Sequence, residues 1–376
     1  MSQAVELVLE QRGFRAGPYT IGYQACDDSS RAVGESDPKR CTANARAFAA
    51  DASLLALVGA YNSFCTGLEL PITNASPSGP LATVSPSNTY VGLTASGPGT
   101  TALEPDQYYP TGLRSFVRLA GNDQAQGSAD AMLARRLGLH RVYLLDDGSG
   151  TAVADTTYTG RALIRLGVNV VGRATWNPDD AEFGALVQKV ADASPDGIYV
   201  SGPLRAVELI GDLRAALGRD VTFFAPDNVG DAEVFYGRPP TTGLYMSAYG
   251  VPLDRLEAAG KRFLAGFEHR YGRPAETIDV VKAAQAAEIV LDAIARSDGT
   301  RASVTNELRR TRVTKSWLGS FGFDRNGDPT HSPFTIYRFP LGTPSHQPPY
   351  ASPADQGGVV NRIIVASPRL ADAPRS

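Results

Sequence analysis

Short β-branched, apolar runs alternate with amphipathic stretches along most of the chain. In the middle of the chain, strand-like runs at residues 142–145, 168–174, 197–200 and 221–225 are separated by helix-like stretches at 152–166, 182–193 and 205–217. Alternation of this kind is typical of parallel sheets covered by helices. The N-terminal third repeats the pattern, with strand-like runs at residues 54–58, 81–84 and 114–119. The sequence therefore predicts an α/β fold with two similar lobes.

Composition limits the possible classes of protein. The 376 residues suffice for two domains, each with its own core. Charged residues make up 20% and the net charge is −3, so we expect no nucleic acid as a partner. No apolar run approaches the roughly 18 residues that cross a bilayer. A chain of this composition is typical of globular proteins.

The sequence predicts neither a metal site nor a cofactor. The four histidines are scattered, and no Cys-x-x-Cys pair occurs. Asp324, Asn326 and Asp328 have the spacing that begins a calcium loop, but Pro329 stands where such a loop needs glycine, so we predict a turn between strands. Residues 148–151 contain two glycines but lack the lysine of a phosphate-binding loop.

Two polar turns follow strand-like runs and are the best candidates for a ligand site. The first, residues 59–63, precedes a helix-like stretch at 66–72, and the second is residues 85–89. Turns at the carboxyl ends of neighbouring strands form a cradle whose backbone N–H groups suit a carboxylate. The candidate residues are Tyr61, Asn62, Ser63, Ser87, Asn88 and Thr89. The alternative is that these side chains only cap a helix or close a turn.

These motifs resemble the type I periplasmic binding proteins. The resemblance rests on Gly-x-Tyr-Asn-Ser at residues 59–63, Ser-Pro-Ser-Asn-Thr at 85–89, and the strand-like run that ends at Asp227. Late segments at residues 321–330 and 336–339 extend it over nearly the whole chain. It is closest to the leucine/isoleucine/valine-binding receptors that serve ABC transporters.

The resemblance implies two doubly wound lobes with flavodoxin-like strand order. Lobe one would hold residues 1–118 and 251–329, and lobe two residues 119–250 and 330–376. Three chain crossings would then form a hinge, with a ligand cleft between the lobes. Clefts at domain interfaces are common sites for small ligands.

The resemblance also assigns residues to the second lobe's side of the site. Asp227 stands where the family places an acidic residue that meets the ligand's ammonium group. Thr151 stands where we match a family tyrosine, and Pro203 or Leu204 replaces a second one. These replacements leave open a wider pocket or a ligand other than a branched-chain amino acid.

The function implied is that of an extracytoplasmic solute-binding protein of an ABC importer. Its ligand would be an amino acid or a related molecule, its partner a membrane permease, and its state a monomer without enzymatic activity. One alternative is a sensing domain of the same fold from a signalling protein. The other is an α/β enzyme, for which the carboxylate pair Asp146–Asp147 would be the candidate acid and base.

The N-terminal region carries two further expectations. Residues 2–12 look helical and residues 20–26 look like a second strand, so we expect the first strand of lobe one to be missing, together with any signal sequence. Cys26 and Cys41 flank a loop that a disulfide could hold, which would leave Cys65 unpaired in the core. The alternative for Cys26 and Cys41 is a pair of free thiols.

Overall fold

The structure, a computed structural model, describes residues 1–30, 36–229, 242–339 and the backbone of 363–365. The chain forms two compact units. Unit 1 comprises Met1–Asn122 and Val251–Ser332, and unit 2 comprises Asp123–Gly250 and Pro333–Ser376. The chain thus passes between units after residues 122, 250 and 332, where the sequence-based boundaries were 118, 250 and 329. Residues 340–362 and 366–376 of the predicted second lobe lie outside the described residues.

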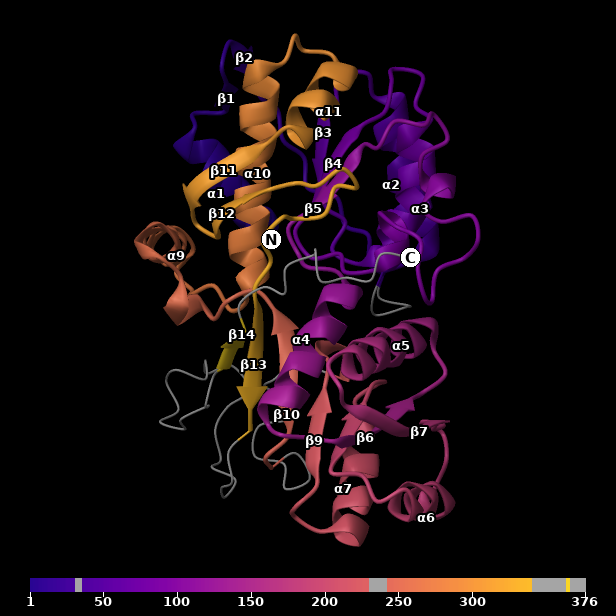
Figure 1. The fold of residues 1–376 in the computed structure, drawn as a ribbon. Helices are drawn as coiled ribbons and strands as arrows, with labels where there is room; N and C mark the ends of the chain where they lie inside the picture. Colours follow the sequence, from indigo (N-terminus) through magenta and orange to yellow (C-terminus); the bar gives the residue numbers. More distant parts are fainter. Residues whose placement is uncertain (31–35, 230–241, 340–362, 366–376) are drawn as a thin grey trace. The chain divides into compact units, whose positions relative to one another are not determined.

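Unit 1 combines a short parallel sheet with helices from both ends of its sequence (Figure 1). Its elements from the first segment are α1 Ser2–Gln11, β1 Arg15–Ala16, β2 Tyr19–Thr20, α2 Pro38–Ala50, β3 Ala56–Val58, α3 Ser63–Asn74, β4 Ala82–Ser85, η1 Val91–Leu93, η2 Asp106–Tyr108 and β5 Phe116–Arg118. The second segment adds η5 Leu253–Arg255, α9 Ala258–Tyr271, α10 Ile278–Arg296, α11 Arg301–Arg309, β11 Arg312–Ser316 and β12 Gly319–Gly322.

The sheet of unit 1 has the order β3-β4-β5, with all strands parallel. Helix α10 packs against β3 and β4, and α1 packs against α10. Buried alanines at 283, 284, 286 and 287 let α10 approach its neighbours closely, while Val8 and Leu9 of α1 bury apolar surface in the same core. Because the second segment supplies α10, the core of unit 1 depends on residues far apart in sequence.

The expected strand at residues 20–26 does not form. Only Tyr19–Thr20 is a strand, and it pairs antiparallel with Arg15–Ala16 rather than with the β3-β4-β5 sheet. Residues 21–28 have no regular structure and are mostly exposed, which fits the glycine at 22 and the polar residues around it. Strand β3 is therefore an edge of its sheet, and residues 1–19 contribute no strand to that sheet.

Unit 2 is a larger version of the same design. Its elements are α4 Asp123–Arg136, β6 Arg141–Asp146, α5 Gly150–Arg165, β7 Asn169–Thr175, α6 Gly184–Asp192, β8 Gly197–Val200, α7 Ala206–Leu217, β9 Thr222–Ala225, η3 Asp227–Val229, β10 Tyr245–Tyr249, β13 Phe334–Arg338 and β14 Ile363–Val365. The strand order is β14-β13-β10-β9-β8-β6-β7, and the five strands from β10 to β7 are parallel.

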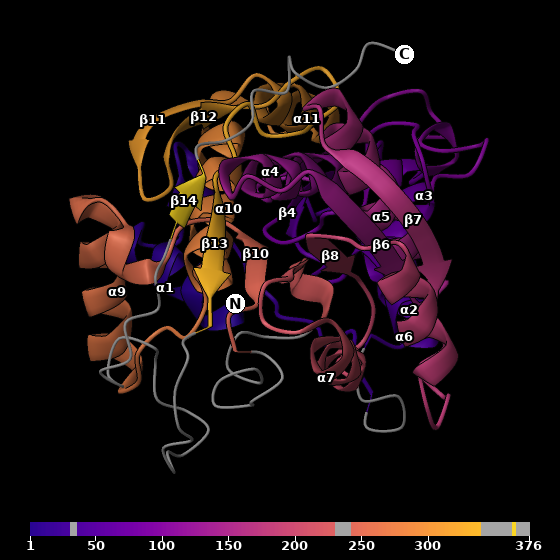
Figure 2. The ribbon, with the colours of Figure 1, turned by 60° about the horizontal axis from the view of Figure 1, so that its bottom comes forward.

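Both faces of the unit 2 sheet are covered (Figure 2). Alternate residues of β8 point to opposite faces: Ile198 and Val200 join the core shared with α7, whereas Tyr199 joins the core shared with α4 and α5. The order β7-β6-β8-β9-β10 is that of a flavodoxin-like doubly wound sheet. The predicted α/β fold class is confirmed.

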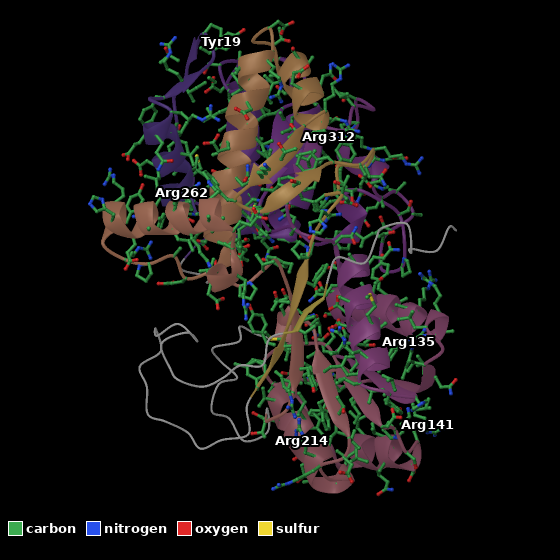
Figure 3. The ribbon with its side chains drawn as sticks, turned by 60° about the vertical axis from the view of Figure 1, so that its left-hand side comes forward. Tyr19, Arg135, Arg141, Arg214, Arg262 and Arg312 are labelled. Atoms are coloured by element: carbon green, nitrogen blue, oxygen red, sulfur yellow. A yellow bond between two sulfur atoms is a disulfide. The ribbon has the colours of Figure 1, made fainter. Side chains whose placement is uncertain are left out.

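Surface arginines close helix ends in unit 2. Arg141, labelled in Figure 3, donates from Nε to the Ser194 carbonyl at 3.0 Å and from Nη2 to the Ala193 carbonyl at 2.7 Å, just beyond α6. Arg214 lies over the Phe223 ring, 4.5 Å from its centroid. The Arg141 side chain combines this structural contact with a solvated charge, whereas burial lowers the pKa of the half-buried Arg214.

Candidate functional site

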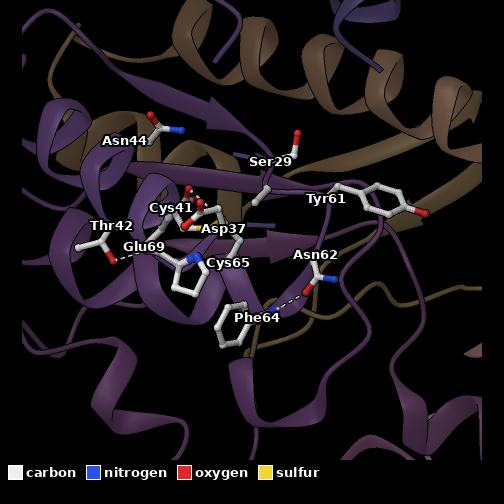
Figure 4. The surroundings of a disulfide bond; sticks show 12 residues. Ser29, Asp37, Cys41, Thr42, Asn44, Tyr61, Asn62, Phe64, Cys65 and Glu69 are labelled. Carbon is white, nitrogen blue, oxygen red and sulfur yellow. Dashed lines mark hydrogen bonds between the residues drawn. A yellow bond between two sulfur atoms is a disulfide. The ribbon is translucent and has the colours of Figure 1, made fainter. Parts of the chain in front are cut away.

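The first polar turn of unit 1 places a helix N-terminus at the end of a strand. Strand β3 ends at Val58 and α3 begins at Ser63, with Asn62 as its N-cap. The Asn62 side-chain oxygen accepts a hydrogen bond from the Phe64 N–H at 2.8 Å (Figure 4). The positive end of the α3 dipole and the N–H groups of its first turn lie at this point, which favours an anion.

The second polar turn is tied to the first by hydrogen bonds from its side chains. The Ser87 hydroxyl donates to the Tyr61 carbonyl at 2.7 Å, and the Asn88 amide donates to the Tyr61 and Ala60 carbonyls at 2.9 and 3.2 Å. Both side chains are buried. Since β3 and β4 are parallel neighbours, their carboxyl ends lie at the same end of the sheet. Ser87 and Asn88 thus hold together the two turns, residues 59–63 and 85–89, called here the turn pair. From the sequence, these side chains were expected either to contact a ligand or to close a local turn.

Ser63 links the turns in the opposite direction. Its hydroxyl oxygen accepts from the N–H groups of Thr89 and Tyr90 at 3.2 and 3.3 Å, which leaves the hydroxyl hydrogen to be donated elsewhere. The half-buried Thr89 hydroxyl makes no hydrogen bond to the part of the chain that the structure describes. The Tyr61 ring beside them is 51% exposed. The turn pair therefore offers two hydroxyl donors and an aromatic face.

A buried arginine binds the backbone of the second turn. Arg118 is fully buried and pairs with Asp328, with Nε 2.6 Å from Oδ1. Its Nη1 donates to the carbonyls of Tyr90 and Asn88 at 2.8 and 3.4 Å. Asn122 donates to the other Asp328 oxygen at 3.1 Å. Sequence reasoning had placed Arg118 at a lobe boundary and Asp328 in a turn between strands, and had missed that the pair supports the turn at residues 85–90.

The predicted turn at residues 324–328 is confirmed. The Asp324 carboxylate accepts from the backbone N–H groups of Asn326, Gly327 and Asp328 at 2.8 to 3.0 Å. Burial raises the pKa of the Asp324 carboxyl, and the nearby Asp328 adds to that effect. The carboxylates therefore organise a turn and an ion pair.

In unit 2, Asp227 and Thr151 both follow strands of the parallel sheet. Asp227 begins η3 after β9, is half-buried, and accepts from the Gln126 side-chain N–H at 2.9 Å. Thr151 is exposed in the first turn of α5, after β6. At the end of the same strand that precedes Thr151, Asp146 accepts from Thr156 and Thr175, and Asp147 accepts from Ser149. Asp146 and Asp147 thus act as turn and helix acceptors.

Two buried carboxyl groups near Asp227 had not been predicted. Asp155 of α5 accepts from the Ser201 hydroxyl at 2.8 Å and from the Asn228 amide at 2.7 Å. Asp130 of α4 lies near Ser247 and Tyr199, but neither of its oxygens makes a well-formed hydrogen bond to a described residue. Burial raises the pKa of both groups, that of Asp130 to about 8. Asp130 has buried neighbours four residues away on both sides, Gln126 and Ala134, whereas Asp155 has one, Thr159.

The predicted disulfide between Cys26 and Cys41 is wrong. The structure joins Cys41 to Cys65, with the two Cα atoms 5.5 Å apart, while Cys26 is exposed and free. The reason is helix packing, because α2 and α3 lie against each other and bring the first turns of both helices together (Figure 4). Next to the bond, burial raises the pKa of Glu69 to about 8, with a smaller contribution from Asp28.

Comparison with known proteins places this architecture. Residues 4–343 match the periplasmic binding protein family. A curated relative, the leucine-, isoleucine-, valine-, threonine- and alanine-binding protein of Pseudomonas aeruginosa, is 23% identical over 235 residues, which is 61% of this chain and 61% of that protein.

Solved structures share the fold at low identity. An ABC transporter substrate-binding protein from Desulfitobacterium hafniense in complex with Leu has a TM-score of 0.72 at 19% identity, over 91% of this chain and 93% of that chain. A leucine-binding protein from Thermotoga maritima has a TM-score of 0.69 at 20% identity, over 94% and 93%. A solute-binding protein from R. palustris in complex with benzoate has 0.68 at 18%, over 99% and 92%.

Together, the α/β units and these likenesses define a two-unit solute-binding protein, a class without enzymatic activity. The chain belongs to the periplasmic binding protein family, in its type I branch. That family is extracytoplasmic. Among the described residues, no helix combines the length and the apolar character needed to cross a membrane.

Proposed function

We propose that this protein is the extracytoplasmic solute-binding component of an ABC importer and that its solute is an amino acid or a close relative. The observation that carries the proposal is the turn pair of unit 1, in which the hydroxyls of Ser63 and Thr89 stand at the N-terminus of α3. Neutral donors at a helix N-terminus suit a carboxylate without a basic side chain. A membrane permease would be its partner, and the chain would act as a monomer.

The second half of the proposal concerns the ammonium group of the solute. Asp227 is half-buried at a strand end of unit 2, and it accepts a hydrogen bond from the neutral amide of Gln126. We propose that Asp227 receives the ammonium group while the unit 1 turns receive the carboxylate. Each unit would then recognise one end of a zwitterion, and binding would favour a state in which both contribute.

Thr151 and Tyr61 would contact the remaining part of the solute. Both are exposed, at 51% for the Tyr61 ring. A threonine in place of an aromatic residue leaves room for larger apolar groups, so aromatic amino acids belong in the test set together with branched-chain ones. Benzoates also belong there, because one solved neighbour was crystallised with benzoate.

Calorimetric titration would test the proposal, after a thermal-shift screen of amino acids and aromatic carboxylates has found a solute. Charge-assisted hydrogen bonds contribute about 1.5–3 kcal/mol, so Asp227→Ala should weaken amino acid binding roughly tenfold to a few hundredfold. The matched control is Asp220→Ala, an exposed acid of the same unit. Ser63→Ala should cost less, because backbone donors remain, with exposed Ser78→Ala as its control.

A solute analogue without the ammonium group completes the design. It should bind wild-type protein more weakly than the amino acid, and Asp227→Ala should not weaken it further. If Asp227→Ala binds the amino acid as tightly as wild type, the assignment of the ammonium group fails. If only aromatic carboxylates bind and Ser63→Ala weakens them, the turn pair is the carboxylate site but the solute class is wrong.

A further inference from the structure

Four side chains that can bind metals gather at the start of α2 and α3 in unit 1. One ligand atom each of Asp28, Cys41 and Cys65 lies within 4.8 Å of the others. Glu69 Oε1 lies 3.6 Å from the Cys65 sulfur. Both cysteines are fully buried, and Glu69 is 7% exposed. Figure 4 shows Glu69 beside the bonded sulfurs.

The carboxyl groups of this cluster lack a cationic partner within the described part of the chain. Among the described residues, neither Asp28 nor Glu69 forms an ion pair with Lys, Arg or His. A disulfide carries no charge and is a weak hydrogen-bond acceptor, so it does not account for two acids at its side. Two sulfurs and two carboxyl groups together are, however, a ligand set of the kind that zinc takes.

The segment that carries Asp28 is held in place independently of any ligand. The Asp28 carbonyl accepts from the Asp37 N–H at 2.8 Å, and Asn44 of α2 donates to the Asp27 carbonyl at 3.1 Å. These bonds fix the backbone of residues 27–28 to α2, which also carries Cys41. Cys65 and Glu69 are one turn apart on α3. The four ligands therefore come from three supported segments.

We propose that reduction of the Cys41–Cys65 disulfide creates a site for one Zn²⁺, with Cys41, Cys65, Asp28 and Glu69 as ligands. A dithiol reductant supplies two electrons and two protons, becomes a disulfide itself, and leaves two thiols in the protein. Zn²⁺ then displaces the protons of both thiols and of any protonated carboxyl group. Ligands at about 2.0–2.3 Å from zinc lie roughly 3.3–3.8 Å apart. The 3.6 Å between Glu69 Oε1 and the Cys65 sulfur already fits this spacing, whereas the two bonded sulfurs must move apart after reduction to reach it. A disulfide oxidant that takes up the two electrons, and is itself reduced to two thiols, re-forms the Cys41–Cys65 bond and releases the metal.

The test compares oxidised and reduced full-length protein. After reduction with a phosphine and its removal, equilibrium dialysis against Zn²⁺ should give one metal per chain in the reduced protein and none in the oxidised protein. Co²⁺ in place of Zn²⁺ should give thiolate charge-transfer absorption and the visible bands of a tetrahedral site. Equal binding by the two forms, or Co²⁺ spectra without thiolate bands, would overturn the proposal.

Variants decide which residues bind the metal. Cys41→Ser should abolish thiolate-dependent binding, whereas Cys26→Ser, which removes the exposed free thiol, should leave it unchanged. Glu69→Gln and Asp28→Asn keep both cysteines and should each weaken Zn²⁺ binding by at least about tenfold, since even outer partners of metal ligands contribute about 10–100-fold. If Cys41→Ser does not fold, these two variants carry the test, and unchanged affinity in both would refute the site.

Discussion

Units 1 and 2 share one sheet design but bury acids in different ways. Unit 1 pairs its buried Asp328 with buried Arg118, which also binds the backbone of the turn at residues 85–90. Unit 2 buries Asp130 and Asp155 near the further carboxyl group of Asp227, and the pKa of each is raised first by burial and then by neighbouring acids. A paired charge is stable over a wide pH range, whereas an unpaired buried acid favours its neutral form. The comparison therefore predicts that the stability of the two units responds differently to loss of a buried charge and to pH.

The largest effect should come from breaking the buried ion pair of unit 1. Asp328→Asn leaves the Arg118 guanidinium buried without its counter-charge, which should lower the free energy of unfolding by about 3–5 kcal/mol. Urea denaturation measures it. Glu208→Gln, which removes an exposed i,i+3 pair with Arg205 in unit 2, is the control and should cost less than about 0.5 kcal/mol. Similar losses in the two variants would contradict the distinction between the units.

Loss of the disulfide should be the next largest effect and should be confined to unit 1. The bond closes a loop with a sequence separation of 24, so Cys65→Ala should lower stability by about 2–4 kcal/mol. Peptide mapping without reduction should recover Cys41 linked to Cys65, and Cys26→Ala should leave both the map and the stability unchanged. Recovery of Cys26 linked to Cys41 would show the structure to be wrong here.

Asp130 of unit 2 should contribute a pH dependence of stability, to which the buried Glu69 of unit 1 adds. The folded-state pKa of Asp130 is about 8, above its unfolded value, so its stabilising contribution is complete below pH about 4 and is lost as the pH rises through 8. Asp130→Asn, which mimics the protonated acid, should be about 1–3 kcal/mol more stable than wild type at pH 8.5 and nearly equal to it at pH 4.5. Urea midpoints across this range test the prediction, with exposed Asp220→Asn as the control. Parallel curves for Asp130→Asn and wild type would exclude Asp130 as the source.

The smallest effect should come from the link between the two turns. Ser63→Ala removes the acceptor of the Thr89 and Tyr90 N–H groups and should cost about 0.5–1.5 kcal/mol. Thr151→Ala, at the exposed start of α5 in unit 2, should cost less. Thermal unfolding without solute compares them. A larger loss for Thr151→Ala would reverse the proposed order, in which the unit 1 turns are the more firmly built.

The sequence predicted the fold well because strand and helix periodicity depends on local pattern. The predicted strand runs that end at Val58, Leu145 and Ala225 formed as strands because each is apolar and bounded by turn residues. Residues 20–26 failed because a strand also needs a neighbour with free backbone groups, and local pattern does not report one. The cysteine pairing failed for a related reason, since it depends on how α2 packs on α3.

The candidate site was predicted in part. The turn residues 61–63 and 87–89 come together as expected from parallel strand ends. The separate roles of these residues were not predictable. The sequence does not show that the Ser87 and Asn88 side chains donate to backbone carbonyls while the Thr89 side chain does not. Asp155 could have been found, since an acid among the buried residues of a helix is itself a signal. Whether Asp227 and Thr151 contact a solute stays a prediction.

The contacts of Arg118 limit how this protein can be redesigned as a biosensor. Changing the solute would begin at the loop of residues 85–90, but one guanidinium holds the Asn88 and Tyr90 carbonyls together with Asp328. A grafted loop that presents the right side chains on a different backbone path would leave that guanidinium without two of its acceptors. Loop libraries for this scaffold should therefore vary side chains and keep loop length, because Arg118 binds main-chain carbonyls, which every residue type provides.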